Sequence, residues 1–450
     1  MATTPATTQT HGSRQERDVK RLRRVAMTSF MGTAMEWYDY FIYGLLAALV
    51  FDELFFPSFD PAVGTVLALL TFGIGFIARP VGAIIFGHLG DRIGRKKTLI
   101  ITLLVIGLST GIIGLLPTFD AIGFAAPILL TTLRFIQGLS LGGEWSGAVL
   151  LAVEHAPAKQ RAFYGAMPQY GSPAGTLVSS GVVAVVTLLP EDQLMAWGWR
   201  IPFLLSFLFL AVALYMRLKV EESPVFTDVV QTQVAKKVET EQRKPLPLIE
   251  VFRHAGGRVL IVIATVLFAS GGFFLMTTYA VSFGTGELGM EPWKLLIATM
   301  IGAVLEAVGI YVGAKLGDRW GAWKTVVAGG ILALVLVVPI ALMLGSGAEV
   351  LVIIAIAIGI GMLGVPYGPL GTMLSELFSA RYRYSGVAVS YNIGGLIGGF
   401  VPSIAGAFAL AVGSAVLVIP VLLGIIMALC VIGGLIAGRV LSRQSETIAV

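Results

Sequence analysis

Long apolar runs separated by short polar turns dominate the chain from residue 25 to residue 438. A helix that spans a bilayer needs about 20 predominantly apolar residues, and most of these runs reach that length. The pattern therefore predicts an all-α polytopic membrane protein with twelve transmembrane helices. The predicted spans cover residues 25–50, 62–87, 98–116, 121–153, 162–189, 199–218, 258–284, 293–315, 322–345, 348–377, 384–411 and 414–438.

The turns between the predicted spans alternate in charge. Every second turn is rich in arginine and lysine, as in Arg14–Arg24, Asp91–Lys97 and Lys315–Lys324. The turns in between are acidic, as in Asp52–Asp60 and the stretch around Glu191. Because basic loops stay on the cytoplasmic side of a membrane, this alternation predicts that both termini are cytoplasmic.

Composition narrows the class of protein further. The chain is 56% hydrophobic and only 13% charged, which excludes an ordinary soluble globule. Its net charge of +5 is small and gathers in the turns, so it indicates membrane topology rather than nucleic-acid binding. The single cysteine, Cys430, excludes a disulfide within the chain. We find no phosphate-binding GxxxxGK[ST] loop, no GxSxG or Cys–His pattern and no metal-ligand spacing. We therefore expect neither an ATP-driven pump nor an enzyme, and no metal or organic cofactor.

The sequence also carries signs of an internal duplication. Gly87–Lys97, predicted to be a tight turn between two spans, has a weaker copy at Gly313–Lys324. A polar connector lies between the two groups of six spans. The predicted divisions are a disordered cytoplasmic tail (1–23), a first six-helix half (24–219), a cytoplasmic connector (220–257), a second six-helix half (258–439) and a cytoplasmic tail (440–450). Paired halves of this kind are typical of secondary transporters.

Charged residues inside the spans are the best candidates for function, because a charge in the bilayer centre is costly and needs a partner or water. Glu36 and Asp39 in the first span and Arg134 in the fourth are predicted to lie at a similar depth. Arg134 can then pair with Glu36 or Asp39, or hold the carboxylate of a substrate. The plainer alternative is a fixed structural ion pair.

Two other charges in the spans stand apart. Arg79 precedes Pro80 nearer the cytoplasmic end of the second span, where its side chain reaches the interface or forms a gate pair. Glu306 is alone midway through the eighth span, which favours a position facing a cavity, where the carboxyl could take up a proton. Hydroxyl and amide side chains at similar depths, including Gln169 and Tyr279, predict a polar cavity lining, although each alone is more typical of helix packing.

Several motifs resemble those of a known family. Gly87–Lys97 and its copy resemble the cytoplasmic signature turn of the major facilitator superfamily. A more specific set resembles the metabolite:proton symporter family and runs from Thr28 to about Ala411: Gly32–Tyr40, Arg79-Pro80, Gln137–Trp145, Trp197–Phe203, Glu222–Phe226 and Glu376–Gly386.

This resemblance implies a bacterial inner-membrane symporter that imports a small organic acid with protons by alternating access. Its expected partners are a small organic anion or zwitterion and membrane lipid, with no nucleic acid, and we expect a monomer. The alternatives are a proton-coupled importer of zwitterions such as proline or betaine, and a passive facilitator or exporter on the same fold. A receptor with a transporter's body would need a signalling domain, for which the tail is too short.

The predicted site residues fall into three groups. For proton coupling they are Glu36, Asp39 and Glu306. For substrate binding they are Arg134, Tyr38, Tyr43, Gln137, Gln169, Tyr279, Tyr391 and Asn392. For gating they are Arg79, Asp91, Arg92, Arg95, Glu144, Glu154, Arg161, Asp318, Arg319, Glu376 and Arg383. Asp91 is expected near a helix N-terminus of the other half, where the helix dipole favours a negative charge.

Overall fold

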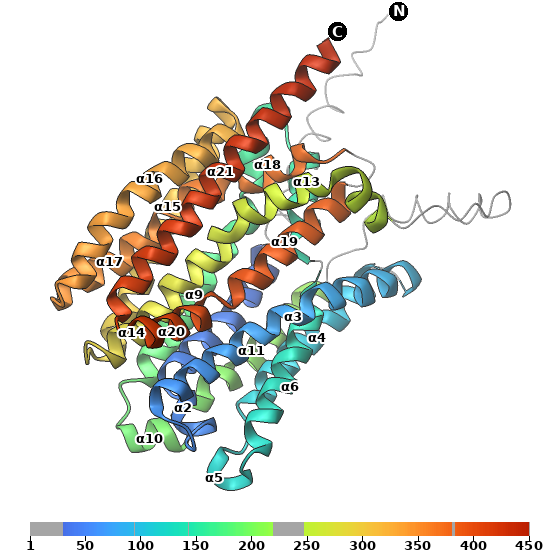
Figure 1. The fold of residues 1–450 in the computed structure, drawn as a ribbon. Helices are drawn as coiled ribbons and strands as arrows, with labels where there is room; N and C mark the ends of the chain where they lie inside the picture. Colours follow the sequence, from blue (N-terminus) through green and yellow to red (C-terminus); the bar gives the residue numbers. More distant parts are fainter. Residues whose placement is uncertain (1–29, 94, 143, 219–246, 380–382, 450) are drawn as a thin grey trace, which may run out of the picture.

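The computed structural model describes the backbone of residues 30–93, 95–142, 144–218, 247–379 and 383–449. Within these ranges every regular element is a helix (Figure 1). The helices lie roughly side by side, as expected for a chain whose backbone groups must pair internally within lipid.

The first half begins with a helix over residues 30–49. The elements that follow it are α2 (Phe51–Phe55), α3 (Pro61–Ile93), α4 (Arg95–Ile113), α5 (Phe119–Ile122), α6 (Ala125–Ser140), α7 (Glu144–His155), η1 (Ala158–Gln160), α8 (Arg161–Gly165), η2 (Met167–Tyr170), α9 (Gly171–Val186), α10 (Glu191–Ala196), η3 (Gly198–Arg200) and α11 (Ile201–Leu218).

The second half has the same character, with two π-helical turns, η4 and η5, in its first crossing. Its elements are α13 (Pro247–Leu267), η4 (Phe268–Gly272), η5 (Leu275–Tyr279), α14 (Ala280–Gly286), α15 (Pro292–Trp320), α16 (Ala322–Gly345), α17 (Glu349–Gly361), α18 (Gly364–Leu377), α19 (Arg383–Gly399), α20 (Val401–Val412) and α21 (Ala415–Ala449).

The described residues contain nine helical segments that are long and apolar enough to cross a membrane. Three further crossings are shorter or interrupted: the helix over residues 30–49, α4, and the segment from α8 to α9. Together these account for the twelve predicted spans. The predicted all-helical membrane fold is confirmed.

Some boundaries differ from those predicted. Helix α3 continues to Ile93 and α4 starts at Arg95, so Gly87–Ile93 is helical and is not part of a tight turn. Glycines inside membrane helices are tolerated because the backbone keeps its internal hydrogen bonds. Helix α13 starts at Pro247, within the predicted connector, and has a non-helical residue at Ala255. Helix α21 extends to Ala449, beyond the predicted end of the last span.

The two halves lie side by side and share several helix contacts (Figure 1). Helix α9 of the first half packs on α15 of the second, α3 packs on α19 and α20, and α7 and α8 pack on α18. Many large apolar side chains on the outer helix faces are exposed, such as Ile84, Val185 and Leu342. An apolar exterior is what lipid requires, so the polar interior between the halves becomes the informative region.

The short helices α2, α5 and α10 lie together at one end of the bundle, opposite the C-terminal end of α21 (Figure 1). These three helices belong to the acidic turns, so the acidic turns share one end of the bundle (Figure 1), as the alternation of charge along the turns predicts. Acids gather at the α2 end: burial, with the charges of Asp52 and Glu191, raises the pKa of the Glu53 carboxyl.

Candidate functional site

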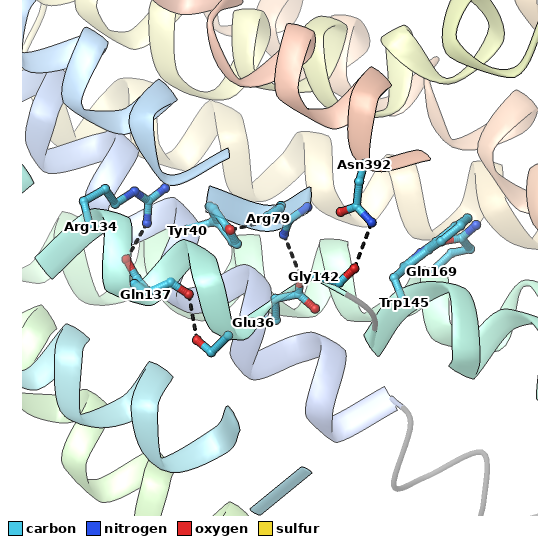
Figure 2. Close-up of polar contacts among 10 residues, drawn as sticks. Glu36, Tyr40, Arg79, Arg134, Gln137, Gly142, Trp145, Gln169 and Asn392 are labelled. Carbon is cyan, nitrogen blue, oxygen red and sulfur yellow. Dashed lines mark hydrogen bonds and ion pairs between the residues drawn. The ribbon is translucent and has the colours of Figure 1, made fainter. Parts of the chain in front are cut away.

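A buried ion pair joins the first two crossings. Glu36, on the helix over residues 30–49, accepts a 2.6 Å hydrogen bond at Oε1 from Arg79 Nη2 on α3. Both residues are 7% exposed. Arg79 Nε also donates to the Tyr40 hydroxyl at 2.9 Å (Figure 2). The sequence offered Arg134 as one possible partner of Glu36, but among the described residues these two form no ion pair closer than 4 Å. Arg79 forms the pair, and its side chain lies inside the protein rather than at the membrane interface.

Arg134, on α6, is fully buried and belongs to a neighbouring network. Its Nη1 donates to Gln137 Oε1 at 2.6 Å, and Gln137 Nε2 donates to Thr110 Oγ1 at 2.7 Å. Its guanidinium carbon lies 4.5 Å from the ring centre of Tyr40 and 4.4 Å from that of Tyr43. Arg134 is therefore held largely by an amide and by aromatic faces, which attract cations. Its Nη2 has no hydrogen-bond partner among the described residues.

Asp39 lies close to this network but is not its counter-ion by direct contact. The Ser206 hydroxyl of α11 donates to Asp39 Oδ1 at 3.0 Å. Among the described residues, Asp39 and Arg134 form no ion pair closer than 4 Å. Tyr38 also faces α11, because its hydroxyl donates to the Pro202 carbonyl at 2.7 Å. The structure thus places Tyr38 and Asp39 at the contact with α11, and Glu36 toward the centre.

A small cavity lies beside the Glu36–Arg79 pair, between the two halves. Its walls come from four crossings: Glu36, Arg79, Leu141, Gly142, Trp145, Ser146, Tyr391 and Asn392. The space of about 10 Å³ is close to the roughly 10–15 Å³ that one water needs. Of the predicted substrate residues, Tyr391 and Asn392 line this cavity, whereas Arg134 does not.

Side chains from the second half close this cavity against the first. The rings of Trp145 and Tyr391 stack at 3.6 Å between centres, with 8° between their planes. Asn392 Nδ2 donates to the Gly142 carbonyl at 2.9 Å (Figure 2). Gln169 supports the stack from behind, because its Oε1 accepts the indole N–H of Trp145 at 3.0 Å.

A second closure between the halves is formed by aromatic rings. It lies around the first crossing of the second half, which contains the π-helical turns η4 and η5. Phe274 packs edge-on against Phe72 at 4.8 Å between ring centres, and Phe41 lies 5.4 Å from Phe273. Each of these contacts joins the first half to the second. The halves therefore touch both at the Trp145–Tyr391 stack and at this aromatic cluster, with the ion pair and its cavity adjacent.

Glu306 lies apart from these groups, on α15. It is 1% exposed, and its Oε1 accepts a 3.1 Å hydrogen bond from the Ser172 hydroxyl of α9. Within the part of the chain that the structure describes, its Oε2 has no hydrogen-bond partner. The predicted cavity residue Tyr279 is also buried, on η5.

The structure describes the side chains of some of the predicted gating residues and not those of the others. Asp318 Oδ1 accepts the Ala162 N–H at 2.9 Å, at the start of α8 in the other half. Thr372 on α18 donates to the Arg161 carbonyl at 3.1 Å. Arg319 and Glu376 are exposed, and Arg383 Nε donates to the Phe378 carbonyl at 3.3 Å. The side chains of the other predicted gating residues lie outside the described residues: Asp91, Arg92, Arg95, Glu144 and Glu154.

The sequence analysis missed the residues that connect these groups. Tyr40 touches both arginines, Thr110 extends the Arg134 network, and Ser172 and Ser206 donate to the two other acids. Of these residues, only Tyr40 could have been identified from the sequence, because it lies one helical turn after Glu36. Serine and threonine are too frequent in membrane helices to be singled out by type alone.

Two six-helix halves with a polar site between them define a polytopic transporter, and comparison with known proteins identifies its family. The family model described as Major Facilitator Superfamily matches residues 29–402. The chain belongs to the major facilitator superfamily, and it is a multi-pass membrane transporter of the bacterial inner-membrane type, not an enzyme.

Its relatives carry small organic molecules. The shikimate transporter of Escherichia coli (strain K12) is 39% identical over 395 residues, which cover 86% of this chain and 88% of the relative. The inner membrane metabolite transport protein YhjE of the same organism is 38% identical over 384 residues, covering 83% and 85%. The proline/betaine transporter of that strain is 33% identical over 398 residues, covering 86% and 78%.

Solved structures confirm the fold. A crystal structure of a D-xylose-proton symporter matches with a TM-score of 0.70 at 17% identity, covering 92% of this chain and 96% of that one. The predicted major facilitator fold and the resemblance to transporters of the shikimate and proline/betaine types are therefore confirmed.

Proposed function

We propose that this protein is a proton-coupled symporter that imports a small organic acid by alternating access. The observation that carries this proposal is the Glu36–Arg79 pair in the wall of a cavity between the two halves. A buried pair of this kind satisfies both charges only while the two remain together. A proton or an anion that enters the cavity therefore competes directly with one partner.

The coupling follows from this competition. Protonation of the Glu36 carboxylate removes its charge and weakens its hold on Arg79. The freed guanidinium then presents N–H donors to a substrate carboxylate, which it can bind through two parallel hydrogen bonds. Binding of the proton and of the anion each favours the other, and such reciprocal coupling is the basis of symport.

Arg79 replaces Arg134 in this mechanism because only Arg79 lines the cavity. Arg134 contributes positive charge from behind Tyr40, over whose ring both arginines lie. Protons serve as the coupling ion, and no organic cofactor takes part. In keeping with the charge of the turns, we place the Asp318 end of the bundle, with both termini, in the cytoplasm.

The cavity in this conformation holds about one water, so a substrate binds only after one of the two closures opens. Arg79 selects for a carboxylate, as found in shikimate, the substrate named for one relative. A zwitterion such as proline or betaine is the second candidate. It has a carboxylate for Arg79, and the faces of Trp145 and Tyr391 attract a cationic group once they separate.

The test is uptake into proteoliposomes with and without an inward proton gradient, across shikimate, other organic acids, proline and glycine betaine. We expect the wild type to accumulate one class only with the gradient. Glu36→Gln keeps the shape of the side chain but cannot exchange a proton. It should abolish accumulation while leaving substrate exchange partly intact.

Asp39→Asn is the matched control, because Asp39 is an equally buried acid on the same helix that lies outside the cavity wall. It should retain gradient-driven accumulation. Accumulation lost in Asp39→Asn and retained in Glu36→Gln would move the coupling to Asp39. Transport by the wild type that ignores the gradient would show a passive facilitator, and gradient-driven substrate efflux would show an exporter.

A further inference from the structure

The Glu306 carboxyl joins the two halves at a second place, away from the substrate cavity. It sits in the middle of α15, in the second half, and receives its hydrogen bond from Ser172 of α9, in the first half. Its other oxygen, Oε2, is fully buried and has no hydrogen-bond partner in the described ranges. The Glu306 carboxyl is not one of the groups that hold the Glu36–Arg79 pair in the cavity wall.

No cation balances Glu306 among the described residues. It forms no ion pair closer than 4 Å. On its own helix the nearest bases are Lys294 and Lys315, roughly 14–18 Å away at about 1.5 Å per residue. Helix α9 has no ionisable side chain at all. The ionisable side chains on the other elements packed against α15 are Lys159, Arg161, Tyr164, Tyr170, Lys324, Glu349, Tyr367 and Glu376.

A buried carboxylate with one hydroxyl donor and no cation is costly to keep ionised, whereas its protonated form carries no charge. The contact with Ser172 suits either form, because a hydroxyl can donate to a carboxylate or to the carbonyl oxygen of a carboxylic acid. The closed arrangement of α9 and α15 is therefore best satisfied when Glu306 holds a proton.

We propose that Glu306 is a second proton-binding site of the transporter, set between the two halves and outside the substrate cavity, which loads and releases one proton in each transport cycle. This inference rests on the proposed proton-coupled function. When the halves separate along α9 and α15, Ser172 leaves, water reaches the carboxyl and the proton departs. When the halves close, the carboxyl must take up a proton again.

Tyr367 lies near both Glu306 and the cavity. It is a buried residue of α18 that lies within electrostatic range of Tyr391, Glu306 and Glu36. Tyr391 lines the cavity beside Glu36. The Tyr367 hydroxyl has no hydrogen-bond partner among the described residues, so no hydrogen-bonded chain joins the two acids in this conformation.

The first experiment counts protons. In proteoliposomes loaded with a pH-sensitive dye, the ratio of protons to substrate is measured with shikimate and with glycine betaine as probes. Glu306→Gln should carry one proton fewer per substrate than the wild type and still respond to the proton gradient. The control is Glu291→Gln, which removes a solvent-exposed acid from the start of the same helix, and its ratio should equal that of the wild type.

An unchanged ratio in Glu306→Gln would overturn the proposal, because the acid would then be a permanently neutral packing group. Failure of the proposed function would look different, since the wild type itself would move no protons with either probe. The two results are distinguishable within one set of vesicles.

A second measurement needs neither a substrate nor a stable Glu306 variant. Infrared spectroscopy of the purified protein at neutral pH should show a carboxylic-acid C=O band from protonated Glu306. Ser172→Ala should shift this band, because it removes the hydrogen bond to Oε1, and Glu306→Gln should remove it. A wild-type spectrum without a band that responds to Ser172→Ala would refute the proposal.

Discussion

Tyr40 shows how one side chain can hold two cations in a membrane interior. Its hydroxyl accepts from Arg79 Nε, and its ring faces the guanidinium carbons of Arg79 at 4.7 Å and Arg134 at 4.5 Å. Two like charges this near each other require compensation, which comes from Glu36, the aromatic faces and the Gln137 amide. Because Arg79 also lines the cavity, the same contacts prepare it to bind an anion.

Arg79→Lys should impair transport although it keeps the charge. A lysine ammonium lacks the planar fork by which Arg79 reaches both Glu36 and Tyr40. Loss of one hydrogen bond to a charged group, worth about 1.5–3 kcal/mol, corresponds to a loss of about tenfold to a hundredfold in the initial rate of proton-driven uptake. Arg200→Lys, away from the cavity, is the control. Wild-type uptake by Arg79→Lys would contradict the role of Arg79.

At the scale of the helix, close crossings place these side chains. Helices α3 and α6 cross so closely that a Cβ atom added at Gly138 would overlap the Gly75 carbonyl oxygen. There is therefore no room for a side chain at Gly138. Small residues at crossings are typical of membrane helices, because packing rather than the hydrophobic effect holds them together in lipid. This crossing sets Arg79 of α3 and Arg134 of α6 on either side of Tyr40.

Gly138→Ala should therefore destabilise the protein. The added Cβ would collide with the Gly75 carbonyl, and overpacking of this kind costs about 1–3 kcal/mol. We expect a lower Tm in detergent, measured by the loss of monodisperse protein on heating. Gly181→Ala is the matched control, since its Cβ would lie 3.8 Å from the nearest atom, Met300 Cε, and its Tm should not change. Equal Tm values for both variants would contradict the close crossing.

At the scale of the whole molecule, the halves are joined by several separate contacts. Asp318 accepts the Ala162 N–H at the start of α8, where the helix dipole favours a negative charge, and the rings of Trp145 and Tyr391 stack across the halves. The aromatic cluster around Phe274 joins the halves separately. Alternating access requires that one set of contacts break while the other holds.

Asp318→Asn should shift this equilibrium toward opening at the Asp318 end. The amide keeps one acceptor oxygen but loses the charge, which weakens the hydrogen bond by about 1 kcal/mol and raises the open population roughly fivefold. Spin labels at Lys159→Cys and Ser379→Cys, in a Cys430→Ser background, would report the separation of the halves. Asp120→Asn, in the exposed short helix α5 at the opposite end, should leave the distances unchanged. Unchanged distances in Asp318→Asn would show that this contact does not bias the halves.

Hydrophobic periodicity and the charges of the turns were enough to predict the fold. Twelve spans and two halves follow from them because the lipid environment imposes one rule on every helix: apolar outside and internally hydrogen-bonded. The transporter family was indicated separately, by the resemblance of motifs such as Gly32–Tyr40 and Gln137–Trp145. The same rule made Glu36, Arg79, Arg134 and Glu306 stand out, since each is an expensive residue in a span. Their burial agrees with that prediction.

The partners of those charges were decided only by the tertiary structure. Depth along a helix can be counted from the sequence, but the rotation of each helix and its neighbours depend on packing across crossings such as Gly75 with Gly138. Arg79, rather than Arg134, therefore reached Glu36, and Glu306 met a serine instead of a cation. The sequence determined which charges lie in the membrane, and the packing of the helices determined which of them face the cavity.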